Sequence, residues 1–80
     1  MTVEDAWNLL HASAPAGWLV GPTNHHKERG EWLMYAFDPS EGAAVGVRKR
    51  EWTAVAQSEE AAVREMARCL AEISAGRVPK

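Results

Sequence analysis

The chain has 80 residues, a formal net charge of −2 at pH 7 and an isoelectric point near 5.9. This length allows one small domain, and the acidic balance argues against a general electrostatic attraction to nucleic acid or to an anionic membrane surface. A single cysteine, Cys69, excludes an intramolecular disulfide. With no signal-peptide pattern and no apolar run long enough to span a bilayer, we expect a cytoplasmic protein.

The first segment of the chain has the pattern of a short amphipathic helix. Thr2 and Asp5 fit a capping box, in which each side chain bonds the backbone N–H of the other residue. Pro15 bars further helix, so we expect this helix to end before it. The apolar residues of its predicted inner face recur at helical spacing: Val3, Ala6, Trp7, Leu10 and Ala14.

Two strands are expected next. Residues 18–20 form a short strand that Gly21 and Pro22 interrupt, which is typical of an edge strand or of a bulge. Residues 23–30 predict a polar turn, and residues 31–37 are the clearest strand of the sequence. Both alternating sets of this strand are apolar, so both of its faces are expected to be covered.

A third strand is expected over residues 44–56, after a turn at 38–42. The valines in its first half are odd-numbered, whereas Trp52 and the alanines after it are even-numbered. An unbroken strand places these two groups on opposite faces. Either a bulge near residues 48–51 switches the faces, or Trp52 points away from the valines.

Residues 58–75 have the strongest helical pattern, with Ser58 as the N-cap and Gly76 at the position after the last turn. Cys69 flanks the apolar face and is expected to be a small buried hydrophobe. The apolar stripe of this helix consists of Val63, Met66, Ala67, Leu70 and Ile73. Two ion pairs are expected on its outer face, Glu60 with Arg64 and Arg68 with Glu72.

These elements predict a single α+β domain over residues 1–80, in the order helix, three-stranded antiparallel meander, helix (α-β-β-β-α). Helices at both ends of a meander usually share one face of it, so we expect two layers with both helices on one face of the sheet. The other face of the sheet would then be open.

The candidate binding site is that open face. If Tyr35 faces Val47 in the neighbouring strand, the opposite side of the sheet gathers aromatic and basic side chains. We therefore predict a non-catalytic interaction module, with no cofactor and no metal, that binds a second copy of itself or a protein partner. The predicted contact residues are Trp32, Met34, Arg48, Arg50 and Trp52.

His25 and His26 are the only adjacent pair of chemically versatile residues. In an extended chain they point to opposite faces, so they do not ligate one metal together without local distortion. A zinc site needs further ligands, and the sequence offers none at metal-binding spacing. We expect both histidines to be exposed at the end of a hairpin.

The order of elements resembles the double-stranded-RNA-binding fold, which small mRNA interferase toxins of toxin–antitoxin pairs also use. In those toxins a Gly-aromatic start of the first strand precedes a His-containing segment, and here Gly17 and Trp18 precede Asn24, His25 and His26. The resemblance implies a nucleic-acid-binding or mobile-element accessory protein, or a ribonuclease that depends on His25 or His26.

This sequence departs from both patterns. The Gly-Ser of the toxins and their basic flanks are missing. At the start of the last helix, Ser58 is followed by two glutamates, whereas the RNA-binding domains have lysines there. A shorter similarity, to the arm-binding domain of phage integrases, rests on Trp32, Tyr35 and the Ser-Glu-Glu-Ala start of that helix. We assign no family from these short likenesses.

Overall fold

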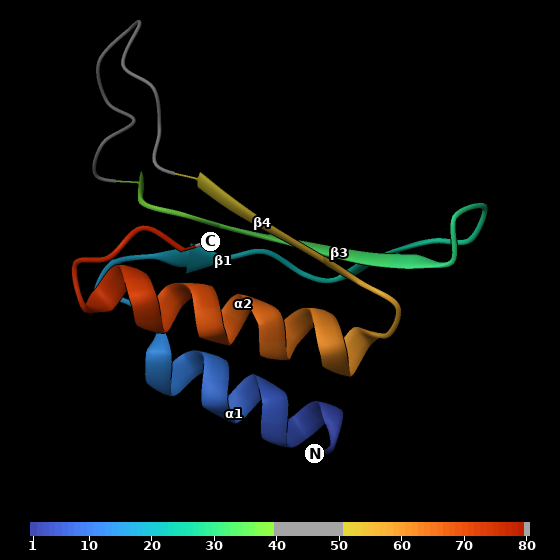
Figure 1. Ribbon diagram of the computed structural model, residues 1–80, viewed down its shortest axis with the longest axis horizontal. Helices are drawn as coiled ribbons and strands as arrows, with labels where there is room; N and C mark the ends of the chain where they lie inside the picture. Colours follow the sequence, from blue (N-terminus) through green and yellow to red (C-terminus); the bar gives the residue numbers. More distant parts are fainter. Residues whose placement is uncertain (40–50, 80) are drawn as a thin grey trace, which may run out of the picture.

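The computed structural model describes residues 1–39 and 51–79. Its helices and strands follow the chain as α1 (Val3–Ser13), β1 (Leu19–Val20), β2 (Asn24–His26), β3 (Glu31–Phe37), β4 (Glu51–Ala56) and α2 (Glu59–Ser74). Both helices lie on one side of an antiparallel sheet (Figure 1). The predicted α+β class, with helices at both ends of the sheet-forming segment, is confirmed.

β3 is the central strand of the sheet. β4 pairs with one side of it, while β1 and β2 pair in succession with the other side. The first half of the predicted third strand, residues 44–50, and its possible bulge lie outside the described residues.

A bulge separates β1 from β2. Val20 lies opposite Ala36 and Asn24 lies opposite Leu33, so residues 21–23 face only two residues of β3. The Gly21 N–H donates to the Tyr35 carbonyl oxygen at 2.8 Å, whereas Pro22 has no N–H to offer. One extra residue in a strand reverses which side chains face each side of the sheet. The predicted interruption at this site is confirmed.

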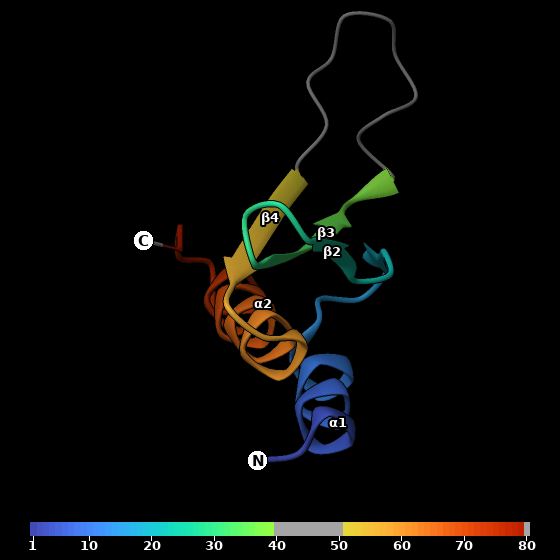
Figure 2. The same cartoon turned by 90° about the vertical axis from the view of Figure 1, so that its right-hand side faces the viewer.

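α2 lies next to the sheet and α1 lies beyond it, packed mainly on α2 (Figure 2). The two helices run in the same direction (Figure 1). Their C-terminal ends are tied together, because the Ser74 hydroxyl donates to the Ser13 carbonyl oxygen at 2.9 Å. That bond satisfies one of the carbonyls that the end of a helix leaves unpaired.

The helix ends form as their sequences predict. The Thr2 hydroxyl accepts from the Asp5 N–H at 3.1 Å, and the Asp5 carboxylate accepts from the Thr2 N–H at 3.3 Å. The Ser58 hydroxyl accepts from the backbone N–H of the third helical residue of α2 at 3.1 Å. Gly76 ends α2 with a φ of 80°, a conformation that suits glycine, and its N–H donates to the Ile73 carbonyl oxygen at 3.0 Å.

The core lies between the sheet and the two helices. Even-numbered residues of β3 and β4 supply its sheet side, and the predicted stripe of α2 supplies most of the rest. Large side chains at its edge, including Trp7, Trp18 and Trp52, are partly buried against it. The buried members of the core are Ala6, Leu10, Met34, Ala36, Ala54, Val63, Met66, Ala67 and Leu70.

Candidate functional site

The residues predicted for an open sheet face lie mostly elsewhere. Met34 has no solvent exposure, and Trp52 packs against the core opposite Ala36, so both belong to the side covered by the helices. Their prediction as open-face residues is wrong. Arg48 and Arg50 lie outside the described residues.

Trp32 lies on the same side as Met34, nearer the hairpin end of β3. It pairs across the sheet with His25, and their rings stack with centroids 4.5 Å apart and planes 11° apart. The indole is therefore partly covered by a neighbour on the sheet rather than left open for a partner.

Side-chain size explains why the helices cover the face of β3 that was predicted to be open. The covered set of β3 contains Ala36, and the covered set of β4 contains Ala54, which pairs with Met34. These small side chains allow α2 to pack closely on this face of the sheet. The other set of β3, Leu33, Tyr35 and Phe37, is bulkier and faces away from the helices. Because both sets are apolar, the alternation in the sequence does not by itself identify the covered one.

The outer face of the sheet is apolar at its centre. Tyr35 is 41% exposed, Val55 is 48% exposed and Leu19 is 52% exposed. Leu33 pairs with Val55, and Phe37 pairs with Leu19, so these side chains form neighbouring cross-strand rows. Within residues 1–39 and 51–79 both helices lie on the other side of the sheet, and the apolar residues exposed on this face belong to the alternating set that was not predicted for it.

The two edges of the sheet differ. The β1–β2 edge is broken by the bulge at Gly21 and Pro22. The β4 edge runs without interruption over six residues, Glu51–Ala56, and all six pair with β3 on the inner side. Within residues 1–39 and 51–79, no strand pairs with the outer side of β4. β4 contains no Pro or Lys, two residues with which edge strands commonly avoid further pairing, and its one charged residue is Glu51 at its start.

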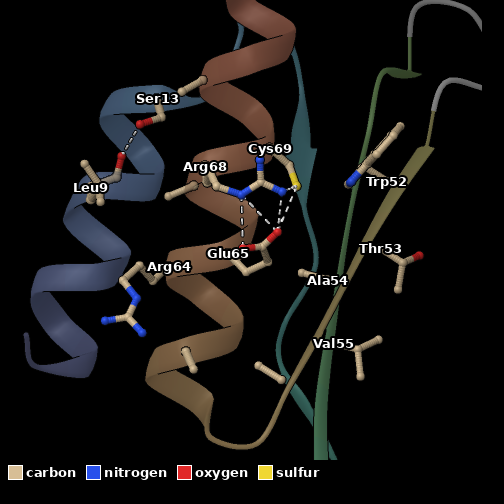
Figure 3. Close-up of a pocket in the computed structure, with 14 residues that line it drawn as sticks. Leu9, Ser13, Trp52, Thr53, Ala54, Val55, Arg64, Glu65, Arg68 and Cys69 are labelled. Atoms are coloured by element: carbon tan, nitrogen blue, oxygen red, sulfur yellow. Dashed lines mark hydrogen bonds and ion pairs between the residues drawn. The ribbon is translucent and has the colours of Figure 1, made fainter. Parts of the chain in front are cut away.

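A groove of about 910 Å³ runs beside this free edge, between β4 and α2, with α1 at its far side (Figure 3). Small apolar side chains, Ala54 and Ala56 of β4 and Ala61 of α2, line its inner part. Arg64 and Arg68 line the helical wall, with Glu65 between them. The groove therefore joins an unpaired backbone edge to an apolar floor and a wall that carries both charges.

The charged wall is held by ion pairs within α2. Both oxygens of the Glu65 carboxylate accept from Arg68 Nε at 3.1 Å, and Arg64 lies 3.2 Å from Glu60. The hydrogen bond from Arg68 lowers the pKa of Glu65 below its ordinary value. The predicted pair of Glu60 and Arg64 is confirmed.

Arg68 pairs with Glu65 rather than in the predicted i,i+4 arrangement, and the predicted partner Glu72 pairs with Arg77 beyond the helix end. Glu65 and Arg68 are also spaced for pairing on a helix, at i,i+3, but the prediction did not include this pair. Choosing between these pairs requires the side-chain conformations, since both spacings bring side chains together on a helix.

Cys69 lies on the β4 side of this wall and is 3% exposed (Figure 3). Its Sγ is 3.7 Å from a Glu65 carboxylate oxygen. Burial, together with the charge of Glu65, raises the pKa of the Cys69 thiol above its ordinary value. The thiol is therefore protonated at neutral pH and serves as a small apolar group, and the predicted burial is confirmed.

His25 and His26 are both exposed, as predicted, and lie on opposite faces of β2. Lys27, Arg29 and Tyr35 join them around a second hollow of about 470 Å³ at the hairpin. Among the residues that the structure describes, no three His, Cys, Asp or Glu side chains are grouped so as to hold a metal ion.

No family model matches the chain, and the searches of curated proteins and of solved structures found no match either. Neither α1 nor α2 is long and apolar enough to cross a membrane. The β4 groove is the site where an unpaired backbone edge, an apolar hollow and charged side chains lie together in the described part of the chain.

Proposed function

We propose that the chain is a non-catalytic protein-interaction module that binds an extended protein segment along the β4 edge. The observation that carries this proposal is the uninterrupted edge of β4 beside the apolar groove, an edge with which no other described strand pairs. An edge strand leaves alternate backbone N–H and C=O groups without partners in the sheet, and an added strand can bond to them.

The shape of the groove favours an apolar strand. Alternate side chains of an added strand would point to the α2 side of the sheet, because side chains alternate across a strand. Ala54, Ala56 and Ala61 leave room there for side chains of moderate size. The ligand class is therefore an extended segment with uncharged side chains at alternate positions.

Charge supports a protein ligand rather than a nucleic acid. Arg64 and Arg68 are each engaged by a carboxylate of the same helix, so the wall has no excess of positive charge among its paired groups. Recognition of a phosphate backbone needs such an excess. The buried, protonated Cys69 thiol likewise supports a binding role over nucleophilic catalysis.

The test uses a synthetic peptide with the sequence of residues 51–57, EWTAVAQ, as a model strand. Titration into the ¹⁵N-labelled protein should shift the amide resonances of β4 and of α2 around Ala61 and Glu65. The control peptide carries proline in place of both Ala54 and Val55. Adjacent residues of a strand direct their N–H groups to opposite sides, so one of the two prolines removes a bond to the protein.

We expect the control peptide to bind at least several-fold more weakly. Equal binding of the two peptides would show that backbone pairing does not hold the ligand. Shifts confined to Tyr35 and its neighbours would place the binding surface on the outer face of the sheet and contradict the proposal.

A further inference from the structure

We infer that the strand that fills this groove is β4 of a second copy, so that two chains form an antiparallel, two-fold symmetric dimer with one continuous sheet. This inference rests on the proposed strand-binding function and names its partner. Two features argue for a second copy, the sequence of β4 and the order of charges on α2.

β4 is suited to pair with itself. In an antiparallel pair centred on Thr53, each Trp52 lies opposite Ala54 of the other copy, which places a large side chain against a small one. Each Glu51 lies opposite Val55 of the other copy, so no two like charges meet. Two Thr residues that lie opposite each other form a favourable cross-strand pair. The side chains of β4 are therefore complementary to those of a second, antiparallel β4.

The helical wall is also suited to a second copy. α2 lies beneath β4 (Figure 2). Edge pairing of two chains would therefore bring their α2 helices side by side and antiparallel. In a two-fold contact, each residue near the axis meets the same set of neighbours from the other copy. Glu65 stands between Arg64 and Arg68 along the wall (Figure 3). Each Glu65 would then face a guanidinium group of the second copy.

The paired side chains of this wall remain partly exposed to solvent. The side chains of Arg64 and Arg68 keep 54% and 47% of their surface exposed, and that of Glu65 keeps 41%. A strongly acidic peptide would gain contacts with the arginines but would be repelled by Glu65, and a basic peptide would meet the opposite conflict. A wall of alternating sign best fits another wall of alternating sign.

The test uses two variants, each of which should weaken its own homodimer by charge repulsion between the two walls. Glu65→Arg gives a wall with positive charge only, and Arg64→Glu combined with Arg68→Glu gives a wall with negative charge only. All three residues are partly exposed, so the fold should tolerate the changes, and a circular-dichroism melt of each variant checks this. Mass is measured by sedimentation velocity across a concentration series at low ionic strength.

We expect the wild type to dimerise and each variant alone to have a dimer dissociation constant roughly tenfold or more above that of the wild type. An equimolar mixture of the two variants should recover a dimer, because each wall then meets the opposite charge. The control is Arg77→Glu, which breaks the exposed pair with Glu72 outside the groove and should dimerise like the wild type.

The inference is overturned if both variants dimerise as well as the wild type, or if mixing them restores nothing. A wild-type chain that stays monomeric at millimolar concentration while it binds the EWTAVAQ peptide would also overturn it, yet would leave strand binding intact. Hydrogen exchange of the wild type gives a check without mutation. Amides on the outer side of β4 should become protected as the protein concentration rises.

Discussion

The two edges of this sheet show how a small domain can leave one side open to pairing and close the other. Along the β1–β2 edge, Pro22 lacks an N–H and the extra residue of the bulge breaks the register, so the edge offers no regular row of hydrogen-bonding groups. Along β4 the row is continuous. Because edge pairing spreads from one chain to the next, a single open edge restricts assembly to pairs, whereas two would allow long sheets.

The largest effect is expected from α2, the helix that packs on β3 and β4. Leu70 has no solvent exposure at the centre of the α2 stripe. Leu70→Ala should lower the free energy of unfolding by about 2–5 kcal/mol, through lost burial and the cavity that remains. Thermal and urea melts measure this change, with Glu72→Ala as the surface control. If the two variants melt alike, the stripe does not hold the sheet.

The difference between the two edges is tested most directly by one lysine substitution on each edge. Thr53→Lys would place two like charges opposite each other at the centre of the proposed dimer, and we expect its dissociation constant to rise roughly tenfold or more. Asn24→Lys is the matched control, since Asn24 is also exposed on an edge strand but lies beyond the bulge. Sedimentation of both variants decides the point. Equal weakening by the two lysines would mean that net charge, not the β4 edge, governs association.

The features of the fold that the sequence predicts are those that depend on residues close together in the chain. The caps at Thr2 and Ser58, the end of α2 at Gly76 and the α2 stripe depend on residues within a few positions of one another, and all were predicted. The interruption at Pro22 is likewise a property of the residue itself.

The covered face and the open edge could not be predicted in the same way. Both alternating sets of β3 are apolar, so the choice of face depends on how closely α2 approaches Ala36 and Ala54, a contact between distant parts of the chain. Predicting the β4 groove also requires the strand order, because a strand lies at the edge of a sheet only when no other strand pairs with its second side. The absence of Pro and Lys in Glu51–Ala56 was the available signal.

The closed edge can be examined through its glycine. Gly21 does not have a positive φ, and a Cβ there would lie 3.6 Å from the Tyr35 carbonyl oxygen, an ordinary contact. Gly21→Ala should therefore raise stability by roughly 0.4–1 kcal/mol, because alanine restricts the unfolded chain. Gly30→Ala, at a φ of 64°, should instead cost about 1 kcal/mol. Paired thermal melts measure the difference. A large loss in Gly21→Ala would mean that the glycine, rather than Pro22 and the extra residue, shapes the bulge.

The smallest effect is expected from the ion pair on the wall of the open edge. Arg68 lowers the pKa of Glu65, so the folded chain holds this carboxylate in its charged form to lower pH than the unfolded chain does. The stabilisation is present above the unfolded pKa, near pH 4, and is lost as the pH falls through the lowered value. Because both side chains are substantially exposed, it should amount to a few tenths of a kcal/mol. Arg68→Gln should reduce the loss of stability between neutral pH and about pH 3 by that amount, measured by urea unfolding at dilutions where the chain is monomeric. An unchanged pH profile would show that this pair does not stabilise the monomer, and that any role of its charges is confined to contacts between chains.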